Sequence, residues 1–202
     1  MRSEPLPNLK VEGALFVLNL ASEATFDGDE AVTTPGRPSQ RKGIELSSSY
    51  KPFPWLRLDG DFAATHARYA NGDPGSGDTE PGHLGNYIPN AANMIATAGA
   101  TVEDLGPWFG ALKFRYFGRR PLIEDDSVTS KPTTLVDLRV GYRLSEQARV
   151  WLDIFNLFDN TGAHQIDYFY PSQLASEIAP VYGIHFKPVE PISIRLTLSM
   201  TF

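Results

Sequence analysis

Charged and apolar residues alternate along much of this chain, and that spacing limits the chemistry that the charges could do. Successive side chains of a β-strand point to opposite faces, so charges two residues apart would share one face of a sheet. Such a face could line a path for a charged solute, or it could be a hydrated wall of cross-strand ion pairs. Arg115 and Arg139 are our candidate ligand contacts on it. The residues expected on this charged face are Glu45, Arg57, Asp59, Asp61, Lys113, Arg115, Asp137, Arg139, Arg143, Asp153 and Arg195.

A second candidate group lies in the stretch 159–190, which includes "AHQIDYFYPSQLASEIAPVYGIHFKPVE". Asp167, Tyr168 and Tyr170 could contact a ligand at the surface of a loop, or they could pack the loop onto the rim of the sheet. His164 and His185 with nearby carboxylates could in principle hold a metal, but their spacing fits no compact ligand motif. We therefore expect neither a metal nor another cofactor.

Motifs for catalysis are missing from the sequence. No Gly-x-Ser-x-Gly elbow occurs, and "NGDPGSGD" (71–78) lacks the Lys-Ser/Thr ending of a phosphate-binding loop, so we interpret it as a loop tip. The chain has no cysteine, and its net charge of −6 offers no basic surface for nucleic acid. We expect a protein that is not an enzyme and does not bind nucleic acid.

The period-two alternation predicts an all-β chain of about eight long strands. Several of them reach about 12 residues, whereas strands of globular proteins usually have 5–6. A strand tilted by about 45° needs roughly 9–11 residues to cross a bilayer. The expected strands are 9–24, 39–51, 54–70, 91–104, 107–119, 132–144, 147–158 and 191–202.

The connections between these strands alternate in length. Tight turns are expected at 51–54, 103–107 and 145–146. Long polar connections are expected at 25–38, 71–90, 120–131 and 159–190. Short turns at one end and long loops at the other are typical of up-and-down barrels of the bacterial outer membrane, whose long loops are extracellular.

The face opposite the charges is apolar and suits contact with lipid. It carries, for example, Leu58, Leu112 and Leu138, and it is nearly free of charge along the last seven strands. Aromatic residues gather near both strand ends, as in membrane proteins: Tyr50, Trp55, Trp108 and Tyr142 near the short turns, and Tyr69, Tyr116 and Phe158 near the long connections. The first strand is ambiguous, because both of its faces hold apolar residues and a bulge could shift its register.

Several stretches resemble the C-terminal barrel of TonB-dependent outer-membrane receptors. The most familiar are "DIFNLFDN" (153–160) and the terminal strand in "HFKPVEPISIRLTLSMTF" (185–202), which ends on Phe202. Others are "RKGIELSSSYKPFPWLRLDGDFA" (41–63), "FRYFGRRPLIEDDS" (114–127) and "IDYFYPSQL" (166–174). The resemblance covers almost the whole chain, so we expect residues 1–202 to be the C-terminal part of such a barrel domain.

The resemblance implies a transmembrane barrel segment in the outer membrane of a Gram-negative cell, with the last eight of 22 strands present and the plug domain absent. It implies energy-coupled uptake of a bulky nutrient such as a ferric siderophore. The implied partners are outer-membrane lipid, the TonB energy-coupling complex through an N-terminal part missing from this chain, and the barrel-assembly machinery through Phe202. The opening "MRSEPLPNLK" has no apolar core after its basic residue, so we expect no signal peptide in it.

Two other architectures remain open from the sequence. A stand-alone eight-stranded outer-membrane barrel, acting as an anchor, an adhesin or a lipid-modifying enzyme, would fit the strand count. A soluble β-sandwich would also alternate apolar and polar residues, but it would bury its apolar face in a core.

Overall fold

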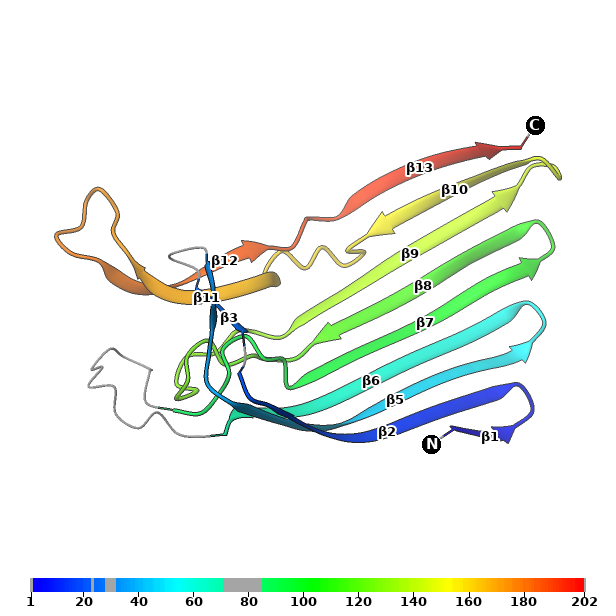
Figure 1. Ribbon diagram of the computed structural model, residues 1–202. Helices are drawn as coiled ribbons and strands as arrows, with labels where there is room; N and C mark the ends of the chain where they lie inside the picture. The colour runs from blue at the N-terminus through cyan, green and yellow to red at the C-terminus, as the bar shows by residue number, and fades with distance from the viewer. Residues whose placement is uncertain (1, 23, 28–31, 71–84, 202) are drawn as a thin grey trace.

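The computed structural model describes residues 2–22, 24–27, 32–70 and 85–201. These residues form an all-β structure dominated by one broad antiparallel sheet (Figure 1). The order of its nine strands is β1 (Arg2–Leu6), β2 (Leu9–Leu20), β5 (Ser39–Phe53), β6 (Leu56–Tyr69), β7 (Met94–Leu105), β8 (Trp108–Phe117), β9 (Thr133–Arg143), β10 (Ala148–Phe155) and β13 (Ser193–Met200).

Eight of these nine strands confirm the sequence prediction, with bounds that differ by a few residues. The additional strand, β1, pairs with β2 and forms one edge of the sheet, while β13 forms the other. In the described part of the chain the two edges do not pair with each other, so the sheet is open. No described helix is long and apolar enough to span a membrane.

Two stretches expected to be loops contain β-hairpins, which corrects the prediction there. The first consists of β3 (Ala24–Asp27) and β4 (Val32–Pro35), and the second of β11 (His164–Ser172) and β12 (Val181–Pro188). The second hairpin is rich in aromatic and β-branched residues, which favour strands, but apolar and polar residues do not alternate cleanly along β11. The expected loop tip at 71–78 lies outside the described residues.

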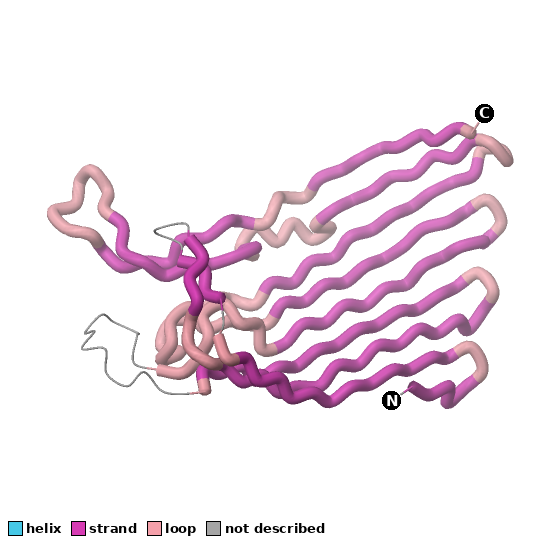
Figure 2. Tube along the Cα trace, viewed as in Figure 1, coloured by secondary structure: helices cyan, strands magenta, loops and turns pink. Residues whose placement is uncertain are grey.

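The two ends of the sheet differ as predicted. The short turns, together with both ends of the described chain, lie at one end, and the long connections with the second hairpin lie at the other (Figures 1 and 2). Aromatic residues mark the short-turn end: Phe53 and Trp55 stack with centroids 5.4 Å apart, and Trp108 meets the edge of Tyr142 at 4.9 Å. Edge-to-face and offset-stacked rings of this kind stabilise a rim between water and an apolar layer.

The strand registers define the two faces of the main sheet and settle the ambiguous first strand. The ladder between β2 and β5 runs without a register shift from Leu9–Tyr50 to Leu20–Ser39. It places Leu15 opposite Ile44, on the apolar side, which we call the outer face. Phe16 and Leu18 instead share the side of the charged residues, which we call the inner face. Leu15 is 83 % exposed. An exposed apolar surface of this kind is typical of a face that contacts lipid or another protein.

One aromatic prediction was wrong. Tyr69 was expected among the aromatics that flank the apolar band, but it is only 4 % exposed and packs in a small core with Ala67 and Ile88 at the long-loop end. The guanidinium of Arg37 lies 4.1 Å from the centre of its ring. The register of β6 places Tyr69 on the inner side, opposite the buried Ser39, and the chain covers it there.

The face assignment predicts that adjacent substitutions on β13 differ in effect. Leu196→Arg should reduce the folded, inserted fraction strongly, because Leu196 lies on the outer face and is 72 % exposed. An arginine facing lipid near the midplane costs about 2–4 kcal/mol. Thr197→Arg, one residue further on the inner face, is the matched control and should insert nearly normally. The unfolding midpoint in urea, followed in lipid vesicles, measures both; equal losses would contradict the assignment.

Candidate functional site

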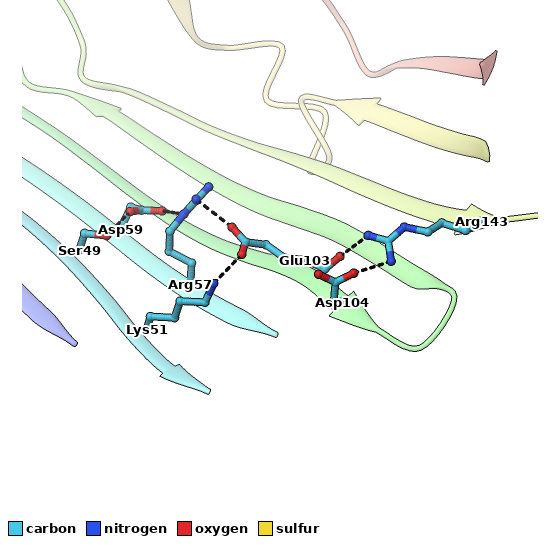
Figure 3. Close-up of polar contacts among 7 residues, drawn as sticks. All are labelled: Ser49, Lys51, Arg57, Asp59, Glu103, Asp104 and Arg143. Atoms are coloured by element: carbon cyan, nitrogen blue, oxygen red, sulfur yellow. Dashed lines mark hydrogen bonds and ion pairs between the residues drawn. The ribbon is translucent and has the colours of Figure 1, made fainter. Parts of the chain in front are cut away.

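Close to the short turns, the inner face carries a network of ion pairs between strands (Figure 3). The Glu103 carboxylate on β7 accepts hydrogen bonds from Lys51 of β5 at 2.9 Å and from Arg57 of β6 at 2.8 Å. Arg143, at the end of β9, donates to the Glu103 carbonyl at 2.7 Å and to the Asp104 carboxylate at 2.5 Å. Four strands are thereby joined just inside their turns.

Further along β6, carboxylates of the inner face are bound by hydroxyl groups of neighbouring strands. Asp59 accepts from Ser49 at 2.9 Å and lies 3.1 Å from Arg57. Asp61 accepts from Ser47 at 2.7 Å and from Thr97 at 3.0 Å. The two hydroxyl groups satisfy Asp61 without a cation, so the inner face around Asp61 stays negative.

On β8 and β9, Arg115 donates to Asp137 at 2.7 Å. The register places Lys113 directly opposite Asp137, but Arg115 reaches it along the diagonal instead. The backbone N–H of Asn156 donates to the other Asp137 oxygen at 3.1 Å. Among the described residues Lys113 forms no ion pair.

Arg139 lies opposite an acidic residue of the neighbouring strand, Asp153. It donates two hydrogen bonds to Asp153 of β10, at 2.5 and 3.2 Å, and the Trp151 indole donates to the same carboxylate at 3.1 Å. Asp153 is 6 % exposed and lies in the ladder between Arg139 and Arg195. The Arg195 guanidinium lies 5.3 Å from the centre of the Phe155 ring.

These side chains line two hollows of opposite charge. A hollow of about 500 Å³ lies over β7–β10. Its charged lining residues are Arg57, Lys113, Arg139, Arg143, Arg149, Glu103, Asp137 and Asp153, five cations against three carboxylates. A second hollow, of about 650 Å³ over β2–β7, contains the carboxylates Glu12, Glu45 and Asp61 and no cation in its described lining. The inner face therefore offers an anion-attracting surface beside a cation-attracting one.

A close contact between an aromatic ring and a glycine shapes the hollow over β7–β10, which we call the positive hollow because cations outnumber carboxylates in its lining. Phe109 of β8 lies opposite Gly141 of β9, and a Cβ atom at position 141 would lie 2.2 Å from the Phe109 ring. The Phe109 ring also meets the edge of Trp151, with centroids 6.4 Å apart. Gly141 is needed because no larger residue leaves room for this ring.

At the long-loop end, Asp167 holds the second hairpin to the connection 118–132. It is 1 % exposed, and its carboxylate binds Arg120 at 3.0 Å and the His164 ring nitrogen Nδ1 at 2.5 Å. Arg120 also donates to the Gln165 carbonyl at 3.3 Å and to the Ser130 hydroxyl at 3.3 Å. Asp167 is thus enclosed by protein, while its assignment as a ligand contact stays a prediction.

The same connection carries a second, more exposed ion pair. Arg119 donates to both oxygens of Asp126, at 3.0 and 2.7 Å. These hydrogen bonds raise the pKa of the Arg119 guanidinium above its ordinary value, so the side chain stays cationic.

Tyr168 and Tyr170 lie on the opposite side of the hairpin from Asp167, because side chains alternate along β11. Tyr168 is opposite His185, and the Tyr170 ring stacks on the His185 ring with centroids 3.9 Å apart. These three rings form one aromatic surface, which we call the tyrosine surface. In the described ranges, no group of three or more His, Asp or Glu side chains is placed to hold a metal ion.

The five predicted site residues therefore form two separate sets. Arg115 and Arg139 are bound to carboxylates on the inner face, and the other three belong to the hairpin. Sequence reasoning missed Arg120 and Glu103, which organise these two regions. Glu103 lies next to a tight turn, where cross-strand charges meet, but its partners come from strands whose register the sequence does not reveal.

The sequence matches a family model described as "TonB dependent receptor-like, beta-barrel" over residues 8–157, three quarters of its 202 residues. The chain belongs to this family. TonB-dependent receptors are transporters and receptors of the outer membrane rather than enzymes, which agrees with the apolar outer face and the long strands. No curated protein matches the sequence.

Solved structures of similar fold support the architecture. The ferric-catecholate import receptor Fiu from E. coli K12, in its closed form, has a TM-score of 0.68 at 20 % identity, with all of this chain and 26 % of Fiu covered. The ferric yersiniabactin uptake receptor FyuA from Yersinia pestis scores 0.66 at 16 % identity, covering 100 % and 29 %. The copper transporter OprC scores 0.64 at 15 % identity, covering 100 % and 31 %. The chain spans less than a third of each of these proteins.

We predict that Gly141→Ala destabilises the sheet. The added Cβ must displace the Phe109 ring, and overpacking of this kind costs about 1–3 kcal/mol. Gly99→Ala is the matched control, because Gly99 also lies on the inner face and its nearest contact would be 3.9 Å away. Urea unfolding midpoints in detergent micelles should fall for the first variant alone; a similar fall for Gly99→Ala would indicate a general intolerance of side chains.

We also predict that Arg120→Met loosens the second hairpin. Removing one partner of a buried ion pair costs about 3–5 kcal/mol, since Asp167 would remain charged without a cation. Arg119→Met, which breaks the more exposed pair with Asp126, should cost no more than about 1 kcal/mol. Limited proteolysis compares the two. The hairpin region 164–188 should be cleaved faster only in Arg120→Met, and equal protection in both variants would show that the pair does not hold it.

Proposed function

We propose that this protein takes up a bulky nutrient, such as a ferric siderophore, across the outer membrane by energy coupling. In this proposal residues 1–202 supply the C-terminal strands of a 22-stranded barrel domain and its extracellular loops, without a plug. The observation that carries it is a family-matched sheet with a charged inner face and an exposed apolar outer face. Such a wall separates a polar passage from lipid.

Named relatives support the class of nutrient. Fiu is an import receptor for ferric catecholate, FyuA takes up ferric yersiniabactin, and OprC is a copper transporter. The positive hollow over β7–β10 would attract an anionic chelate into the passage. The proposed substrate is therefore a metal chelate with net negative charge.

We assign roles to the predicted site residues within this proposal. Tyr168 and Tyr170 contact the substrate first, at the extracellular mouth, with His185 stacked behind Tyr170. Arg115 and Arg139 act later, on the wall of the passage, where each can exchange part of its carboxylate contact for the substrate. Asp167 keeps the tyrosine surface in place through Arg120.

The proposed partners follow from the same family. Energy would come from the TonB complex through a part of the receptor outside these residues. The outer face would contact outer-membrane lipid, and Phe202, which lies outside the described residues, would be read by the barrel-assembly machinery.

The test is uptake by a strain that depends on this protein, supplied with labelled ferric siderophores and copper chelates. At least one chelate should be taken up, and a protonophore should abolish its uptake but not its binding. Uptake that continues in the presence of the protonophore would contradict energy coupling. If none of the tested chelates is taken up, the proposed class of nutrient is wrong.

Once a chelate is identified, we predict that Tyr170→Leu weakens its binding about tenfold, because aromatic contacts of this kind contribute roughly 1 kcal/mol or more. Tyr182→Leu is the matched control, since Tyr182 lies on the other side of the same hairpin. Fluorescence quenching on intact cells measures both. Equal affinities for wild type and Tyr170→Leu would show that the tyrosine surface does not bind the chelate.

A further inference from the structure

A basic cluster lies on the outer face, at the long-loop ends of β5 and β6. It consists of Lys42, His66 and Arg68, and we call it the rim cluster. Lys42 pairs with His66 across the two strands, and Arg68 follows two residues later on the same side. Its place on the outer face is set by the ladder, because Lys42 also pairs with Val17, which is 66 % exposed.

The rim cluster begins where the apolar surface ends. On the outer face, the neighbours of the cluster toward the short turns are apolar. Ile44 and Leu46 follow Lys42 on β5, and Phe62 and Ala64 come before His66 on the antiparallel β6. A strand rises about 3.4 Å per residue, so Lys42 lies about 7 Å beyond Ile44, the last apolar side chain of its row. In a barrel spanning a bilayer, that level is the headgroup region of the outer leaflet.

The charges of Lys42 and Arg68 are not neutralised by neighbouring carboxylates. Among the described residues Lys42, His66 and Arg68 form no ion pair. The Arg68 guanidinium lies 3.4 Å from the centre of the Tyr87 ring and donates to the Ala67 carbonyl at 2.7 Å, contacts that hold its position without cancelling its charge. The neighbouring carboxylate, Asp126, is already bound by Arg119.

A small pocket adjoins His66 and Arg68, the two cluster residues on β6. It has a volume of about 140 Å³, and its lining includes His66, Arg68, Tyr87 and Asn93 together with the paired Arg119 and Asp126. On β8 and β9 the outer-face residues nearest the long loops are uncharged. They are Tyr116 on β8 and its cross-strand partner Thr134 on β9. Positive charge is therefore concentrated at one place on the rim.

We propose that the rim cluster binds the phosphate group of an anionic lipid in the outer leaflet. Cations just outside the apolar band attract such headgroups, at about 1 kcal/mol for each Lys or Arg. The acyl chains would lie along the outer face below, over Leu15 and its cross-strand neighbour Ile44. Free phosphate shares the chemistry, but only a lipid also uses this exposed apolar surface.

The experiment uses the protein reconstituted in bilayers of phosphatidylcholine with traces of spin-labelled phosphatidylglycerol or spin-labelled phosphatidylcholine. The fraction of immobilised label gives the preference for the anionic lipid. Wild type should prefer phosphatidylglycerol, and Lys42→Gln/Arg68→Gln should reduce this preference about tenfold, somewhat less than the two cations could contribute together.

The matched control is Lys10→Gln/Lys113→Gln, which removes the same charge from the inner face and should keep the preference. Heat-dependent gel mobility confirms that each variant is folded. Added inorganic phosphate separates the two sources: at millimolar concentration it should displace little lipid, and complete displacement would show a site for free phosphate instead. An unchanged preference in Lys42→Gln/Arg68→Gln, or an equal loss in the control, would overturn the proposal.

Discussion

The unbroken antiparallel ladder is the constraint on which the rest of this structure depends. Side chains alternate with a period of two, so a slip of one residue in any strand pair would exchange its outer and inner faces. The ladder between β2 and β5 holds its register over all twelve residues of β2. The exposed apolar outer face, the ion-pair networks and the two hollows all follow from it.

Ion pairs and hydrogen bonds across the strands are consequences of that register rather than its cause. Most are exposed on the inner face, where single pairs contribute a few tenths of a kcal/mol to about 1 kcal/mol. The pair between Arg120 and Asp167 differs, because both side chains are buried. Enclosed charge of this kind fixes a conformation more than it adds stability, since desolvation offsets much of the attraction.

The sequence predicts the strands of the main sheet well and the site poorly, for a physical reason. Strand existence and facing follow from local alternation, which Arg139 and Leu138 already display. Partners such as Glu103 for Lys51 depend on register between distant strands, and Tyr69 was misplaced because only the folded loops reveal that it is covered. The second hairpin was missed because apolar side chains lie on both sides of its strands, which hides the period-two alternation.

The division of the inner face into a negative and a positive hollow has a consequence for anything that passes along it. Carboxylates dominate over β2–β7 and cations over β7–β10, so the electrostatic potential changes sign across the width of the sheet rather than along its length. A solute whose charges are separated would experience a torque in such a field. The wall would therefore orient a dipolar molecule about the axis of its passage before any direct contact formed.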